Sequence, residues 1–238
     1  VEVVVTATPL PTEDIITLNW NFSTEPPTMD PSLAEDTTSN DCVESLFLGL
    51  TAFDSDGNVV GELAEDWTTN GAGDVYTFNL RQDAVWVKYN PGTSAVEELG
   101  PVTAHDVEYG IKRTLNPETA SGYAYVLYII KGGEALNTAD TGALSAEEVQ
   151  ELLDGVGVRA VDDYTLEITL EHPAGYFPGI AGMWVARPMP QAAIEERGDR
   201  WIEPGFIVTN GPYMLAEWAH DDHVTLIKNP LYYAADTV

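Results

Sequence analysis

The chain has 238 residues, of which 44% are hydrophobic and 10% aromatic, enough to form a packed core in one large domain or two small ones. Its 39 Asp and Glu residues against 10 Lys and Arg residues give a formal net charge of -29. A surface of that charge repels phosphate backbones and anionic headgroups, which excludes nucleic acid and membrane surfaces as expected partners, although an acidic surface can also serve solubility alone.

Strand signals dominate the first part of the chain, after a Thr- and Pro-containing lead (residues 1–14) that we expect to be flexible. Residues 15–22 (IITLNWNF) alternate in polarity and are rich in β-formers, which predicts a strand that the following prolines end. Residues 48–67 predict the end of a helix, a strand, a turn at Asp56–Gly57 and a returning strand. One further strand is expected in VYTFNLRQDAVW (75–86).

A helix with clear ends is expected in VTAHDVEYGIKRTLNP. Thr103 is its predicted N-cap, and Asp106 stands at the third helical position. Val107 and Ile111 share one apolar face, and Pro117 stops the helix because proline cannot continue it.

The second half begins with an equally clear helix, LSAEEVQELLDG, in which Ser145 and Glu148 form a capping box and Gly155 marks the end. The next segment, DDYTLEITLEHP, alternates apolar and polar residues and predicts a half-buried strand. A helix around QAAIEERG and a β-rich pair, GPYMLAEW and HVTLI, are expected to follow. The predicted class is therefore mixed α and β, without a repeat of 20 to 50 residues.

Cys42 is the one cysteine, so no internal disulfide can form. It lies in DCVESLFLGL, where the apolar residues recur at helical spacing, and a lone thiol on such a face is usually a small buried hydrophobe. No histidine stands in a recognisable partner motif, so we do not expect a nucleophile.

Two short acidic patterns imitate metal sites. The spacing of Asp54, Asp56, Asn58 and Glu65 resembles a calcium loop, but the position that needs a glycine is Val59, so a hairpin turn with solvated carboxylates is favoured. The HDDH run at residues 220–223 is interpreted as a turn with exposed polar side chains.

No catalytic motif stands out elsewhere. GAGDVY lacks the third glycine of a dinucleotide fingerprint and opens a strand rather than a helix. Carboxylate pairs occur throughout so acidic a chain and cannot single out a glycosidase. The sequence therefore predicts a protein that is not an enzyme and has no cofactor and no metal site.

A series of local patterns follows one order along the chain. The patterns are EPPTMDP, LAEDW, YTFNLRQDAVW, PVTAHDVEYGIKR, NPETASGYAYVLY, VDDYTLEITLEHPAGYFP, IVTNGPYMLAEW and KNPLYY. This order resembles the peptide-binding solute receptors of ABC importers, in the oligopeptide-binding branch of extracellular solute-binding family 5.

The resemblance implies a periplasmic-binding-protein-like class II clamp of two lobes, with an additional domain inserted in the first lobe. Members are longer than this chain, so we expect it to be an N-terminal portion that lacks the second lobe. Residues 1–47 and 160–238 would form lobe I, and residues 48–159 the inserted domain. An extracellular or periplasmic lipoprotein, tethered by an N-terminal lipid, is the expected context.

The resemblance also suggests ligand-binding residues. The segment after the LDP-like motif lines the cleft in the relatives, which places Glu35 and Thr37 there, although Thr37 departs from an aliphatic residue. The tyrosine of an ASPY-like run matches Tyr123, whereas Tyr125 and Tyr128 are expected to pack inward. Without the family, Tyr123 would be taken as a half-buried core residue and Glu35 as a solvated carboxylate at a helix end.

The expected function is capture of oligopeptides, by a monomer, for the permease subunits of an ABC importer. Within the same family the cargo could instead be an oligosaccharide, nickel or a haem-like molecule. The six tryptophans would suit stacking on sugars, but most lie in family motifs that suggest core packing. An extracellular hydrolase that uses a carboxylate pair, and a sensor or chaperone-like module without an importer, remain alternatives.

Overall fold

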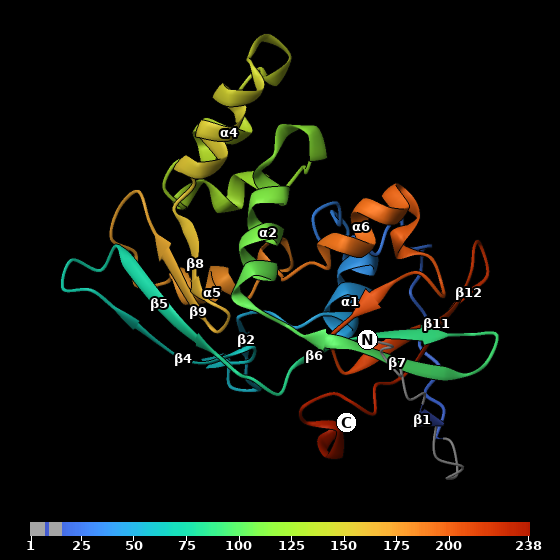
Figure 1. The fold of residues 1–238 in the computed structure, drawn as a ribbon. Coiled ribbons are helices and arrows are strands. Elements are labelled where there is room, and N and C mark those ends of the chain that lie inside the picture. The colour runs from blue at the N-terminus through green and yellow to red at the C-terminus, as the bar shows by residue number, and fades with distance from the viewer. Residues whose placement is uncertain (1–7, 10–15) are drawn as a thin grey trace, which may run out of the picture.

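The scaffold is antiparallel β-structure covered by helices, in a computed structural model that describes residues 8–9 and 16–238 (Figure 1). The strands are β1 (Thr8–Pro9), β2 (Thr51–Phe53), β3 (Val59–Gly61), β4 (Ala64–Thr69), β5 (Val75–Leu80), β6 (Val85–Asn90), β7 (Ala95–Pro101), β8 (Val158–Asp162), β9 (Thr165–Thr169), β10 (Val208–Thr209), β11 (Tyr213–Ala219) and β12 (His223–Lys228). The mixed α and β class predicted from the sequence is confirmed.

The helices lie between and beside these strands. The α-helices are α1 (Thr37–Leu46), α2 (Ala104–Leu115), α3 (Gly133–Asn137), α4 (Ala146–Gly155), α5 (Phe177–Ala181) and α6 (Gln191–Arg197). The 3₁₀ helices are η1 (Pro117–Thr119), η2 (Ala124–Ile129), η3 (Thr141–Ala143), η4 (Trp184–Ala186), η5 (Gly198–Ile202) and η6 (Ala235–Thr237). No helix among residues 8–9 and 16–238 is both long enough and apolar enough to cross a membrane.

One sheet has the order β4-β5-β9-β8, with every neighbouring pair antiparallel (Figure 1). Phe78 pairs with Leu166 and Tyr76 with Ile168, and all four side chains are buried, as the alternation along β9 predicts. Helix α2 packs against β8 and β9 and closes this side of the core.

The ends of α2 are those that the sequence predicts. Asp106 Oδ2 accepts a hydrogen bond from the backbone N–H of Thr103 at 2.7 Å. Val107 and Ile111 are buried, and the helix stops at Leu115, before the proline. In α4 the capping box is also present, with the Ser145 N–H donating to Glu148 Oε2 at 2.8 Å and the Glu148 N–H donating to Ser145 Oγ at 3.2 Å. These local interactions explain why both helices could be predicted accurately.

A second sheet has the order β1-β7-β6-β10 and includes a hairpin, β6–β7, that the sequence analysis did not predict. The predicted strand at 75–86 is in fact the whole of β5 and the start of β6, because the chain turns between them and the Arg81 N–H donates to the Leu63 carbonyl at 2.9 Å. The C-terminal hairpin, β11–β12, turns at the HDDH run as expected, with Asp221 at φ 63°.

The strand predicted at residues 15–22 is wrong for the part that the structure describes. Residues 16–22 form neither helix nor strand, and Ile16, Leu18 and Trp20 are 96%, 83% and 72% exposed. Residue 15 lies outside the described residues. The alternating pattern indicates an extended segment, but a strand also needs a neighbour for its backbone groups, and none is paired with this one.

The division into residues 1–47 with 160–238 and residues 48–159 stays a prediction. Position 160 falls inside β8, and β9 pairs with β5 across the predicted boundary. One core cluster also extends from Met29 to Trp218. Of the lead predicted to be flexible, Thr8 and Pro9 pair with β7, and its other residues lie outside the described ones.

Candidate ligand-binding site

The segment that carries Glu35 and Thr37 is fixed at its start by a buried ion pair. Asp30 is 2% exposed, and it accepts hydrogen bonds from both terminal nitrogens of Arg113 on α2, at 2.8 and 2.7 Å. Trp201 Nε1 donates to the same carboxylate at 3.0 Å. A bidentate pair with a further donor fixes the orientation of the carboxylate, so the MDP motif holds the following residues beside α2.

Glu35 contacts the loop that carries Tyr123. The backbone N–H of Gly122 donates to Glu35 Oε1 at 3.1 Å, across 87 residues of sequence. A Cβ atom on Gly122 would lie 2.1 Å from the same oxygen, so a larger residue there would require the exposed Glu35 side chain to move. Glu35 is exposed, and among the described residues no ion pair is formed with it. Its second oxygen therefore remains available as an acceptor.

Tyr123 follows Gly122 directly and is half-buried. Its ring packs edge-on against Trp184 of η4, with centroids 5.3 Å apart and planes at 62°. Trp184 Nε1 in turn donates to the carbonyl of Ala34 at 2.9 Å, and Ala34 precedes Glu35. The structure thus brings Glu35 and Tyr123 together, and Trp184 joins their two segments.

Thr37 is placed less definitely. It is the first residue of α1 and is exposed, while the N-cap of that helix is Asp36, whose carboxylate accepts from the Ser39 N–H at 2.9 Å. Within the described part of the chain, no hydrogen bond joins the Thr37 side chain to Glu35 or Tyr123. A role for Thr37 therefore rests on its proximity in the sequence.

The inward packing expected for the two later tyrosines is right for Tyr128 and wrong for Tyr125. Tyr128 is half-buried, and its hydroxyl donates to Asn137 Oδ1 at 2.7 Å. Tyr125 is 58% exposed, because η2 is a 3₁₀ helix that turns Ala124 and Leu127 into the core and leaves Tyr125 on the outer side. Of these two tyrosines, Tyr128 therefore packs against the core and Tyr125 faces solvent.

Sequence reasoning missed Gly122 and Trp184 as parts of this site. A glycine beside a tyrosine is a visible signal, but nothing local indicates that its missing side chain accommodates a carboxylate from a distant loop. Trp184 lies 150 residues from the carbonyl to which it donates. Only the tertiary structure could reveal either contact.

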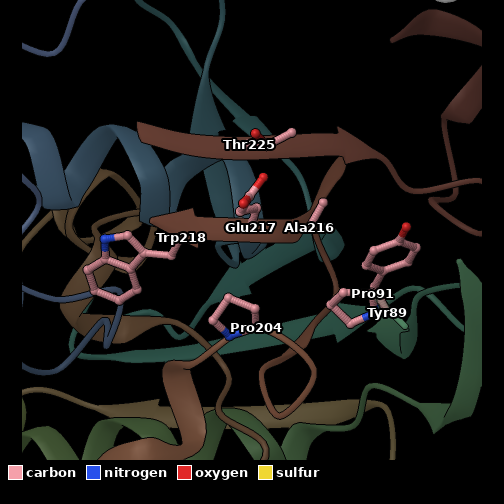
Figure 2. A pocket seen from close by; sticks show the side chains of 7 residues that line it. All are labelled: Tyr89, Pro91, Pro204, Ala216, Glu217, Trp218 and Thr225. Atoms are coloured by element: carbon pink, nitrogen blue, oxygen red, sulfur yellow. The ribbon is translucent and has the colours of Figure 1, made fainter. Parts of the chain in front are cut away.

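Two surface hollows lie away from these residues. The first, of about 430 Å³, lies between the β6–β7 and β11–β12 hairpins (Figure 2). It is lined by Tyr89, Pro91, Pro204, Ala216, Glu217, Trp218 and Thr225. The second, of about 570 Å³, lies between α2, β8 and β9 and the end of α4. Glu35, Thr37 and Tyr123 line neither hollow; Glu35 and Thr37 are exposed, and Tyr123 is half-buried.

The ring of Trp218 forms one wall of the first hollow, but it offers a ligand little surface. Trp218 is 8% exposed, and its Nε1 donates to Glu25 Oε1 at 2.6 Å, so its polar edge is already satisfied. Figure 2 shows that Tyr89 and Trp218 stand at opposite ends of the hollow. The rings therefore do not form one continuous stacking surface.

The described residues also give no support for metal or thiol chemistry. Residues 8–9 and 16–238 contain no group of three or more His, Cys, Asp or Glu side chains placed to hold a metal ion. Cys42 is buried as predicted, and burial, assisted by the nearby Asp41 carboxylate, raises the pKa of its thiol to about 12. At neutral pH this thiol is protonated and inaccessible.

Comparison with known proteins points to one family. The profile for bacterial extracellular solute-binding proteins, family 5, matches residues 58–238. The periplasmic oligopeptide-binding protein OppA of Escherichia coli is 36% identical over 224 residues, which cover 91% of this chain and 36% of that protein. The probable deoxycholate-binding periplasmic protein YgiS of the same organism is 32% identical, over 94% of this chain and 38% of that protein.

A solved structure shares the fold. The substrate-binding domain of an oligopeptide ABC transporter from Bacillus anthracis matches with a TM-score of 0.77 and 32% identity, over 90% of this chain and 38% of that one. The chain thus spans somewhat more than a third of the length of the proteins that it resembles.

Proposed function

Because the chain belongs to family 5 of the bacterial extracellular solute-binding proteins, we propose that it forms the N-terminal part of a receptor that captures oligopeptides for an ABC importer. The names of the relatives support a peptide as the cargo. The observation that carries the proposal is the contact of Glu35 with Gly122, beside Tyr123 and Trp184. It brings together two distant segments that the resemblance to the family assigns to the cleft.

In this proposal a peptide lies between two lobes, and this chain supplies the first lobe and an inserted domain. Residues 1–47 and 160–238 would form lobe I, and residues 48–159 the inserted domain. Because β9 pairs with β5, a boundary that keeps this sheet in one domain would lie after β9 rather than at residue 160. The ligand contacts both lobes only in the closed state, so binding and closure favour each other.

Each proposed contact residue has a chemical task. The free oxygen of Glu35 accepts a hydrogen bond from a donor on the ligand, and Tyr123 offers a ring face together with a hydroxyl. The hydroxyl of Thr37, on the first turn of α1, could add a third polar contact. None of these groups performs a reaction, and we propose that the cargo leaves the receptor unchanged.

The remaining expectations are proposals of the same kind. The receptor works as a monomer outside the cytoplasmic membrane, held there by an N-terminal lipid, and delivers its cargo to permease subunits. The family description supports an extracellular location.

A different cargo is the second candidate, because one relative is named as a probable deoxycholate-binding protein. Flat, apolar cargo would use the aromatic faces of Tyr123 and Trp184 rather than the polar contacts of Glu35. An extracellular hydrolase is a weaker candidate, since no described feature favours it.

Native mass spectrometry of the whole receptor, purified from its own host, tests the proposal directly. We expect masses of bound peptides that disappear after denaturation. A bound sterol-like, sugar or metal species would contradict the peptide assignment, and hydrolysis of added peptides would contradict capture without chemistry.

A further inference from the structure

An aromatic row continues beyond the proposed contact residue Tyr123. The ring centroids of Tyr125 and Tyr123 are 5.7 Å apart, with planes at 30°, and the ring of Tyr123 also contacts Trp184. Tyr125 is 58% exposed. A large ring that contacts a proposed ligand-binding residue and is itself open to solvent can add apolar area to the surface that a ligand covers.

The local structure holds Tyr125 in this position. Ala124 and Leu127, three residues apart, are the buried residues of η2, and this fixes which side of the 3₁₀ helix faces the core. Tyr128 lies one turn beyond Tyr125, but its hydroxyl is committed to Asn137. Tyr125 makes no hydrogen bond to any described residue, and its ring lies in a tilted contact with the ring of Tyr123.

We propose that Tyr125 is a specificity-determining contact, which favours peptides with a large apolar side chain at one position. This inference rests on the proposed function and names a preference within it. A tyrosine offers rigid apolar area at a low cost in side-chain entropy, and a leucine or phenylalanine side chain laid on it removes further apolar surface from water. With no polar partner at Tyr125, the contact discriminates by apolar area rather than by charge.

The test compares peptides on the whole receptor, by calorimetric titration for affinity and by NMR for the ring signals of Tyr123 and Tyr125. The ligands are tetraalanine and its variants with a single leucine or a single lysine, placed in turn at each position. The protein variants are Tyr125→Ser and, as a matched control, Tyr176→Ser, since Tyr176 is 63% exposed and belongs to the start of α5. Circular dichroism verifies that both variants fold.

We expect one leucine peptide to bind roughly three- to tenfold more tightly than tetraalanine, from the additional apolar area that it buries. This gain should disappear in Tyr125→Ser and persist in Tyr176→Ser. If the leucine peptide still binds more tightly than tetraalanine in Tyr125→Ser, the inference is overturned. It is also overturned if Tyr125 increases the affinity for the lysine peptide more than that for the leucine peptide.

These results separate the inference from the proposed function. If every peptide shifts the Tyr123 signals equally while Tyr125 does not respond, the inference fails and the capture of peptides stands. If no peptide shifts either ring, the inference fails as well, and the cargo found in the native mass spectrum then decides the proposed function.

Discussion

Asp30 is the residue on which the geometry of the candidate site most depends. It is buried, and it joins the segment before Glu35 to α2 through Arg113 and to η5 through Trp201. The sequence pattern identified MDP as a family motif but gave no partner for its aspartate, because Arg113 lies 83 residues away. The resemblance suggests which residues bind the ligand, and those roles stay predictions, but it could not supply the contacts that position those residues.

Removal of Asp30 should therefore destabilise the whole chain. We expect Asp30→Ala to lower the free energy of unfolding by about 3 kcal/mol, because it leaves the Arg113 guanidinium without its partner in a largely buried position. Urea denaturation measures the change. The control is Asp83→Ala, which removes a surface pair with Arg81 and should cost less than about 1 kcal/mol. Equal losses in the two variants would contradict this account.

The Cys42 thiol gives a second test at the scale of one residue. Burial raises the pKa of this thiol from its ordinary value of 9.0 to about 12. Between these two pKa values the folded state keeps a thiol proton that the unfolded state loses. The contribution of the protonated Cys42 to the free energy of unfolding is therefore complete below pH 9.0 and is lost as the pH rises toward about 12. We expect an aromatic disulfide reagent to modify Cys42 at pH 8 only after denaturation. Rapid modification of the folded chain would show that the thiol is not buried.

Elements whose signals are local were predicted accurately, and elements that depend on a distant neighbour were not. The caps of α2 and α4 and the alternation of β9 are complete within each segment. Residues 16–22 have a strand pattern but no pairing partner among the described residues. The β6–β7 hairpin is an exception, because its two consecutive strands pair with each other and it was still not predicted. Tyr125 faces outward because η2 is a 3₁₀ helix. The spacing of apolar residues in the sequence does not indicate that this segment is a 3₁₀ helix.

Helix α4 should be the element most sensitive to loss of its cap. It contains no buried residue, so its stability depends on local interactions more than that of α2 does. We expect Ser145→Ala to cost about 1 kcal/mol locally and to accelerate amide hydrogen exchange in α4 while exchange in α2 stays unchanged. Ser55→Ala, in the exposed β2–β3 turn, serves as the control. Equal protection of α4 before and after the change would contradict the role of the cap.

At the scale of the whole molecule, a strongly acidic surface coexists with an uncovered apolar segment. Ile16, Leu18 and Trp20 expose large side chains within five residues, while the charge of -29 opposes contact between copies. Added salt screens the repulsion between the acidic chains, so it should allow the apolar segment of one copy to contact another copy.

We therefore expect the isolated chain to be monomeric at low ionic strength and to associate as salt is added, as followed by sedimentation velocity. The double variant Leu18→Ser, Trp20→Ser should associate less. The control is Phe53→Ser, Tyr176→Ser, which removes two rings of 62% and 63% exposure outside the segment. If both double variants behave like the unmodified chain, the segment is not the site of association.

The central claim is that this chain supplies one side of a binding site whose other side lies elsewhere in the receptor. Glu35, Thr37 and Tyr123 line neither surface hollow, and a ligand that contacts only these residues buries little of its surface. Calorimetric titration of the 238-residue chain with a mixture of peptides tests the claim most directly. We expect binding that is weaker than micromolar or absent, and micromolar or tighter binding by the isolated chain would contradict the account.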